Sequence, residues 1–268
     1  MYDIIFSDYD FTLYGKSGKV SQKTKDAIQR YISSGGKFII STGRIYQSVK
    51  PAAKDLGLTG DIITSQGSQI YNIDTDLPVL TTYPNPELVA EILEYAKKKK
   101  MLAQCYADNK VYADFHLVFN GFCKRFFGMT INKTFRLPKL VRHGKIKPNK
   151  FELIIKEDVI DKELEYLSEK YPSLLFSKSA KFMLEIVSKE ATKGEATKYL
   201  LNRYGVPKER AVAIGDGNND LDMMDAVGLK VAVSNGESKL KEKADYITKN
   251  TEGDGVAELI DLILEGKL

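Results

Sequence analysis

The chain has 268 residues, of which 43% are hydrophobic, and a formal net charge of +4 at pH 7. This composition excludes an intrinsically disordered chain and suffices for one large globular domain or two ordinary ones. Neither a signal peptide nor 18 consecutive apolar residues is evident, so the sequence predicts a cytoplasmic protein with no membrane partner. Only Cys105 and Cys123 are present, too few for a disulfide framework.

Short apolar runs alternate with helical patterns over the first 80 residues. We expect strands at residues 4–7, 38–40 and 62–63, helices from Ser21 to the Gly35-Gly36 pair and over 45–56, and a hairpin through 69–71 and 79–82. Such alternation is typical of βαβ units and predicts a parallel sheet.

The pattern changes at Pro84 and Pro86, which indicate a domain boundary. In the next hundred residues we expect helices at 89–96 and 159–171 and strands at 151–155, 174–176 and 182–187. From Thr192 the α/β alternation returns, with helices at 192–204, after Asn219 and at 256–264, and strands at 211–214 and 231–233. We therefore predict an α/β fold: a Rossmann-like parallel-sheet core, residues 1–83 plus 188–268, split by an inserted α+β cap domain of residues 84–187.

Four polar segments fall where an open parallel sheet places its ligands, beyond the carboxyl ends of strands or at the start of a helix. They are Asp8, Asp10 and Thr12; Ser41-Thr42-Gly43-Arg44; Lys193-Gly194; and Gly215-Asp216-Gly217-Asn218-Asn219-Asp220. Each of the first three is common by chance. The fourth is more specific, because acids, asparagines and glycines after a buried strand pack poorly but make good oxygen ligands.

The chemistry of these segments points to a divalent cation and a phosphate. Asp8 and Asp10, one residue apart, repel each other unless a cation compensates. The Thr42 hydroxyl and the backbone N–H groups at a helix start can hold phosphate oxygens. The sequence therefore indicates a metal-assisted site for a phosphorylated ligand.

In these four segments the chain resembles the haloacid dehalogenase-like phosphohydrolases, specifically their Cof-type branch. The likeness extends over residues 231–236 and to Lys241, Ala244-Asp245 and residues 253–257, and so covers the whole split core. The inserted residues match this family in position and size more than in sequence.

The resemblance implies a role for each matching residue. Asp8 would be the nucleophile that forms an aspartyl-phosphate, and Asp10 the general acid and base. Lys193 would take part in catalysis and, with Thr42, Gly43 and Asn219, would bind the phosphate or substrate. Mg²⁺ would be the cofactor, held by the Asp8 carboxylate, the Asp10 backbone carbonyl and Asp216, while Asp220 would orient these groups.

The chain departs from the family at two positions. Phe11 stands where this branch usually has glycine, and Gln66 where it often has asparagine. Neither change removes a catalytic group, but both could alter the entrance to the site. The carboxylate of Asp10 favours hydrolysis over mere storage of a phosphoenzyme.

The preferred interpretation is a monomeric, magnesium-dependent phosphatase of small phosphorylated metabolites, with sugar phosphates as the leading class. A phosphomutase or phosphotransferase of the same fold is the nearest alternative. An anionic-ligand or nucleic-acid binding module is an alternative of another class, because no acidic residue lies between Asp114 and Glu152. The complete catalytic set argues against nucleic acid as the partner. Within the basic segment, Arg125, Arg136, Arg142 and Lys145 could attract an anionic substrate.

Overall fold

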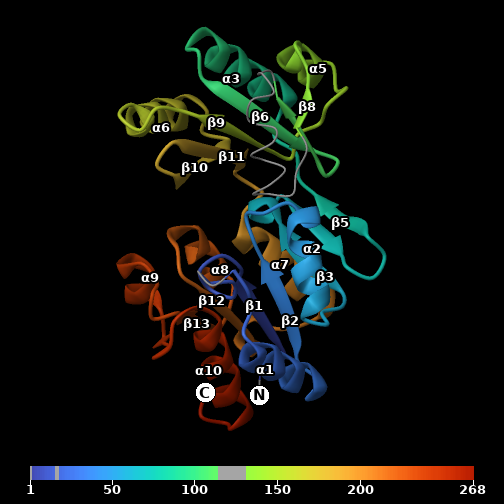
Figure 1. The fold of residues 1–268 in the computed structure, drawn as a ribbon, viewed down its shortest axis with the longest axis vertical. Helices are drawn as coiled ribbons and strands as arrows, with labels where there is room; N and C mark the ends of the chain where they lie inside the picture. Colours follow the sequence, from blue (N-terminus) through green and yellow to red (C-terminus); the bar gives the residue numbers. More distant parts are fainter. Residues whose placement is uncertain (1, 16–17, 114–130) are drawn as a thin grey trace. The chain divides into compact units, whose positions relative to one another are not determined.

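The computed structural model describes residues 2–15, 18–113 and 131–268 (Figure 1). These residues form two compact units. The first unit comprises residues 1–44, 49–80 and 192–268, and the second comprises residues 45–48 and 81–191. Of the basic residues named above, Arg125 lies outside the described residues.

The first unit contains an eight-stranded sheet in the order β14-β13-β12-β1-β2-β3-β4-β5. The strands from β14 to β3 pair in parallel, whereas β3 and β4 form an antiparallel hairpin. Their bounds are β1 Ile4–Asp8, β2 Lys37–Ser41, β3 Asp61–Thr64, β4 Gln69–Asn72, β5 Leu77–Thr81, β12 Ala211–Gly215, β13 Leu229–Ala232 and β14 Tyr246–Ile247. The predicted α/β fold with a parallel-sheet core is confirmed.

Within the described residues, the α-helices of the first unit are α1 Gln22–Ser33, most of α2 Tyr46–Asp55, α7 Lys193–Tyr204, α8 Leu221–Asp225, α9 Ser238–Lys243 and α10 Glu252–Leu264. On one face of the sheet, Ile4 and Phe6 pack with Leu200 of α7 and with Met223 of α8. The helices α1 and α10 pack against each other. Because side chains alternate along a strand, the fully buried strands β1 and β12 contribute side chains to both faces of the sheet.

The ends of the helices follow local sequence signals. The Ser21 hydroxyl accepts a hydrogen bond from the backbone N–H of Thr24 at 3.2 Å and so begins α1. The Thr192 hydroxyl does the same for Glu195 at 3.2 Å in α7, which ends at Gly205 with a φ of 65°. This cap fixes where α7 starts, and therefore where Lys193 lies.

The second unit contains a six-stranded sheet in the order β10-β11-β9-β6-β7-β8, antiparallel except for the pair β7–β8. The strands are β6 Leu102–Ala107, β7 Lys110–Ala113, β8 Ile131–Lys133, β9 Lys150–Ile154, β10 Leu174–Ala180 and β11 Met183–Ser188. Its helices within the described residues are α3 Pro86–Lys98, α5 Leu137–Arg142 and α6 Ile160–Lys170. Ile45, just before α2, groups with this unit because its side chain packs with Tyr106 and Val111.

The two faces of the second sheet differ in character. Alternate residues such as Cys105, Phe151 and Leu184 pack with the helices in an apolar core. The residues between them are polar and nevertheless buried: Gln104, Tyr106, Lys150, Glu152 and Glu185. Among the described residues, no helix has the length and apolar character that crossing a membrane requires.

Candidate active site

The predicted site residues of the first unit converge because neighbouring parallel strands end at the same edge of the sheet. Asp8, the last residue of β1, lies opposite Ser41 of β2. On its other side, Ser7 of β1 lies opposite Ile214 of β12, so the Gly215–Asp220 segment begins beside Asp8. The β strands shown in Figure 1 thus bring three of the four polar segments together.

Lys193 brings its own segment, Lys193-Gly194, into contact with two of the other three. Its side chain is 1% exposed, and its Nζ donates to Asp8 Oδ1 at 2.5 Å and to Asp220 Oδ1 at 2.7 Å. Burial alone would lower the pKa of Lys193, but the charges of Asp220 and Asp8 outweigh it and raise the pKa. Lys193 is therefore a fixed cation between two buried carboxylates.

A third carboxylate, Asp216, completes the cluster. Carboxylate oxygens of Asp8, Asp216 and Asp220 all lie within 4.8 Å of one another. Burial and the neighbouring charge of Asp220 raise the pKa of Asp8 well above its usual value. Burial, offset in part by a hydrogen bond from Thr12, raises the pKa of Asp216 to about 6. Three carboxylates around one ammonium leave excess negative charge, which a divalent cation would neutralise.

The hydrogen bonds distinguish Asp220 from the other two acids. While its Oδ1 faces Lys193, its Oδ2 accepts the backbone N–H groups of Asp216 and Gly217, both at 3.1 Å. Asp220 therefore folds the loop and positions Lys193. Asp8 and Asp216 are the carboxylates suited to contact a metal ion, and oxygen donors of this kind fit Mg²⁺.

Thr42 and Gly43 lie in a tightly packed turn after β2. Thr42 is buried, and its hydroxyl accepts the Arg44 backbone N–H at 3.1 Å. A Cβ atom at Gly43 would lie 2.5 Å from Nε2 of Gln66, so the Gln66 side chain occupies the space beside this glycine. Gln66 itself has a φ of 60°. This residue, which departs from the family pattern, thus lies against the predicted phosphate-binding turn.

Asp10 has a different partner from Asp8. Its two carboxylate oxygens accept from the Arg44 guanidinium, with Nε to Oδ2 at 2.9 Å and Nη2 to Oδ1 at 2.6 Å. Burial lowers the pKa of Arg44, but the hydrogen bonds and charge of Asp10 raise it overall. Arg44 lies within one of the four predicted segments, but its residue type and position in the sequence alone indicated no role for it.

The loop after Asp10 adopts an unusual conformation at Phe11. This residue has a φ of 60°, in the left-handed region, and its side chain is 52% exposed. The Phe11 carbonyl accepts a hydrogen bond from Asn235 Nδ2 at 2.8 Å, and the Phe11 N–H donates to the Tyr14 carbonyl at 2.9 Å. Glycine is the residue that this backbone favours.

The remaining candidates are Asn219 and the basic residues of the second unit. Asn219 is exposed in the middle of the short turn Asn218–Asp220 that precedes α8. In the second unit, Arg142 already pairs with Glu87 and Glu94, both at 2.8 Å, so its charge is largely neutralised. Arg142 is therefore a weaker candidate for attracting an anionic substrate than Arg136 and Lys145.

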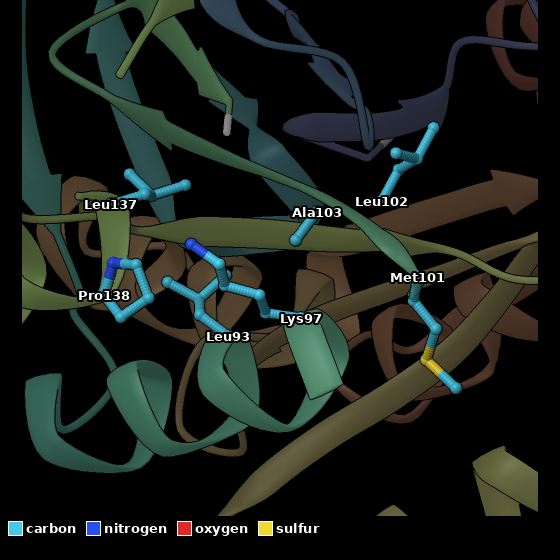
Figure 2. Close-up of a pocket in the computed structure, with 7 residues that line it drawn as sticks. All are labelled: Leu93, Lys97, Met101, Leu102, Ala103, Leu137 and Pro138. Carbon is cyan, nitrogen blue, oxygen red and sulfur yellow. The ribbon is translucent and has the colours of Figure 1, made fainter. Parts of the chain in front are cut away.

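A small pocket of about 110 Å³ lies within the second unit, between α3, α5 and the start of β6 (Figure 2). Lys97 is its only charged lining residue; the others are Leu93, Met101, Leu102, Ala103, Leu137 and Pro138. None of the predicted catalytic residues lines this pocket, and we assign no ligand to it.

Comparison with known proteins gives one consistent result. The family model of haloacid dehalogenase-like hydrolases matches residues 5–260. The 5-amino-6-(5-phospho-D-ribitylamino)uracil phosphatase of Bacillus subtilis is 28% identical over 286 residues, covering 97% of each chain. The phosphoglycolate phosphatase of Methanobrevibacter smithii is also 28% identical and covers 97% of each chain. A crystal structure of a Thermotoga maritima protein, 29% identical, matches with a TM-score of 0.84 over 97% of each chain.

Proposed function

The chain belongs to the haloacid dehalogenase-like hydrolases, and on that premise we propose that it is a magnesium-dependent phosphatase of small phosphate monoesters, with sugar phosphates as its leading substrate class. The observation that carries this proposal is the buried ion pair of Lys193 with Asp8 and Asp220, beside Asp216. A buried ammonium among three acids is a costly arrangement that suits phosphoryl transfer.

In the first step Asp8 is the nucleophile. One of its carboxylate oxygens forms a bond to phosphorus, and the bond from phosphorus to the leaving oxygen breaks. The electron pair of that bond goes to the leaving oxygen, which takes a proton from Asp10. Lys193 and the turn at Thr42 and Gly43 stabilise the negative charge on the phosphoryl oxygens.

In the second step Asp10 acts as the base. It takes a proton from a water molecule, whose oxygen attacks the phosphorus of the aspartyl-phosphate. The bond from phosphorus to Asp8 breaks, which releases inorganic phosphate and restores the carboxylate. The carboxylates of Asp8 and Asp216 and the backbone carbonyl of Asp10 would hold Mg²⁺, which supplies charge neutralisation for the phosphate when bound.

The second unit is proposed to set substrate choice. The two named relatives act, by their names, on a ribitylaminouracil phosphate and on phosphoglycolate, which are chemically dissimilar. Because their overall similarity to this chain is the same, family membership alone does not determine the leaving group. The sugar-phosphate class is therefore the part of the proposal that most needs a direct assay.

The test is a panel of phosphate esters assayed for inorganic phosphate release by protein treated with EDTA and then supplied with Mg²⁺. The panel should include hexose phosphates, phosphoglycolate and a phosphate ester that carries a pyrimidine. We expect release only with the metal, and fastest from a hexose phosphate. Isomerised phosphate ester without phosphate release would instead favour the phosphomutase. Salt-sensitive retention on DNA or RNA without any turnover would favour the binding module.

A further inference from the structure

Both oxygens of the Asp10 carboxylate are engaged by a single side chain. The Arg44 guanidinium donates through Nε and Nη2 to the two oxygens, at 2.9 and 2.6 Å. A bidentate ion pair of this kind fixes the plane of the carboxylate as well as its position. A single hydrogen bond, or an ammonium group, would leave the carboxylate free to rotate.

Arg44 is in turn held by two tyrosine rings. Tyr9 and Tyr14 stack with their ring centroids 5.0 Å apart, and the guanidinium carbon of Arg44 lies 5.0 Å from the centroid of Tyr9 and 5.6 Å from that of Tyr14. Tyrosine is neutral at pH 7, and burial raises the pKa of Tyr9 further, to about 12. Aromatic faces attract a guanidinium and restrict its orientation.

The backbone on both sides of the contact is also anchored. The Arg44 N–H donates to the Thr42 hydroxyl at 3.1 Å, and the Arg44 carbonyl accepts from the Ser65 N–H at 2.8 Å. On the other side, Tyr14 N–H donates to the Tyr9 carbonyl at 2.7 Å, which closes the loop that carries Asp10. Arg44 and Asp10 thus meet between two loops of fixed shape.

Stability does not account for this arrangement. The side chains of Arg44 and Asp10 are 37% and 39% exposed, and ion pairs in contact with solvent contribute only about 0–1 kcal/mol. We propose that Arg44 is a positioning residue, which orients the Asp10 side chain for proton transfer at the leaving oxygen. The observed pair corresponds to Asp10 as the carboxylate, the form that remains after this proton is given and that takes the proton of the attacking water in the second step. This inference rests on the proposed function, because it presupposes that Asp10 is the general acid.

The consequence is a specific dependence on the leaving group. An alkoxide leaving from a sugar phosphate needs the proton of Asp10 as its bond to phosphorus breaks. A 4-nitrophenolate ion leaves without protonation. Misorienting Asp10 should therefore slow attack on the first substrate and spare the second, whereas a general loss of structure should slow both.

The experiment compares kcat/KM for a hexose phosphate with kcat/KM for 4-nitrophenyl phosphate. We choose kcat/KM because it reports only the steps up to departure of the leaving group. The first variant is Arg44→Lys, which keeps the charge but loses the bidentate ion pair with Asp10. The control variant is Arg30→Lys. Arg30 forms an exposed ion pair with Asp261 in the same unit. The double variant Arg44→Lys with Asp10→Asn completes a cycle.

We expect Arg44→Lys to lower kcat/KM for the hexose phosphate about 10- to 100-fold, a typical cost of a misplaced catalytic group, and for 4-nitrophenyl phosphate less than about 3-fold. Arg30→Lys should change neither value. In the Asp10→Asn background, Arg44→Lys should have no further effect on the hexose phosphate.

Equal losses for both substrates, or no loss for either, would overturn the positioning role. So would a selective loss that persists in the Asp10→Asn background, because Arg44 would then act without Asp10. The proposed function fails separately, if the unaltered protein releases no phosphate from any ester with Mg²⁺. The acid role of Asp10 fails if Asp10→Asn alone lowers kcat/KM equally for the two substrates.

Discussion

Lys193 donates a hydrogen bond to Asp220 at 2.7 Å, with both side chains at most 1% exposed. The other oxygen of Asp220 accepts two backbone N–H groups, so one carboxylate both shapes the loop and fixes the ammonium that neighbours Asp8. The positions of Lys193 and of the loop that carries Asp216 therefore depend on Asp220, although metal binding and phosphate binding are proposed for other residues.

Replacing Asp220 by asparagine should destabilise the protein and slow turnover together. An asparagine side chain has one acceptor oxygen, so it cannot accept from Lys193 and also from the backbone N–H groups of Asp216 and Gly217, and buried donors left without a partner cost about 1–3 kcal/mol. Urea unfolding followed by circular dichroism measures this change. Asp245→Asn is the control, because Asp245 also accepts a backbone N–H, from Lys230 at 2.9 Å, but is exposed to solvent. This control substitution should lower the free energy of unfolding by less than about 1 kcal/mol. Equal stability of Asp220→Asn and the unaltered protein would contradict the structural role of Asp220.

Phe11 offers a test of backbone strain beside Asp10. Its φ of 60° disfavours any residue with a Cβ atom, by about 1–2 kcal/mol. Phe11→Ala removes the ring and keeps the Cβ, while Phe11→Gly removes both. We expect the glycine variant to be more stable than the alanine variant by about 1 kcal/mol in thermal or urea unfolding. If alanine were as stable as glycine here, the left-handed conformation would not be strained.

The polar face of the second sheet contains a buried ion network. Lys150 lies 2.9 Å from Glu152 and 3.0 Å from Glu185, and Tyr106 donates to Glu152 at 2.7 Å. Despite burial, the two glutamates raise the pKa of Lys150. Lys150→Met would leave two carboxylates buried without this cation.

We therefore expect Lys150→Met to lower the free energy of unfolding by about 3–5 kcal/mol. Lys178→Met is the matched control, because Lys178 pairs with Asp161 at 2.8 Å in solvent and should cost less than about 1 kcal/mol. Similar costs for the two variants would show that the buried network does not stabilise the second unit.

Glu258 gives a pH dependence whose sign can be worked out. Burial opposes ionisation, but hydrogen bonds from Lys249 N–H, Tyr246 and Asn250 lower the pKa of Glu258 overall. A carboxyl whose pKa is lower in the folded state stabilises the fold above its unfolded pKa of about 4.3, and this contribution is lost as the pH falls through the folded pKa. Glu258→Gln should thus be destabilising at pH 7, and the difference should shrink towards pH 3.

The measurement is the thermal midpoint of both proteins across this pH range. Glu265→Gln serves as the control. Glu265 directly follows α10 and forms a solvent-exposed ion pair with Lys267 at 2.6 Å. At pH 7 the thermal midpoint of Glu265→Gln should differ from that of the unaltered protein by no more than a stability change of about 0.5 kcal/mol produces, as is usual for surface substitutions. A Glu258→Gln difference that is constant with pH would rule out a lowered pKa as its cause.

The sequence was informative wherever topology alone brings residues together. Asp8 ends one strand of the parallel sheet and Asp216 directly follows the neighbouring strand, so their proximity follows from the order of the strands. The contact of Asp10 with Arg44 was not predicted, because it depends on the conformation of two loops and in particular on Phe11.

The second unit was predicted less completely than the first. The hairpin of β6 and β7 was missed, although Asp108 and Asn109 form a two-residue turn with φ values of 50° and 57°. An Asp-Asn pair between apolar runs is a usable signal for such a turn. The short helix Leu137–Arg142 was also missed, because its six residues are too few for a periodic pattern.

The central claim is that Asp8 carries the phosphoryl group. Rapid acid quenching during turnover, followed by mass measurement of the peptide that contains Asp8, tests it most directly. We predict a phosphorylated Asp8 in the unaltered protein, and neither this adduct nor phosphate release in Asp8→Asn that remains folded. Phosphate release by Asp8→Asn at the rate of the unaltered protein, or a phosphoryl group found on another residue, would contradict the account.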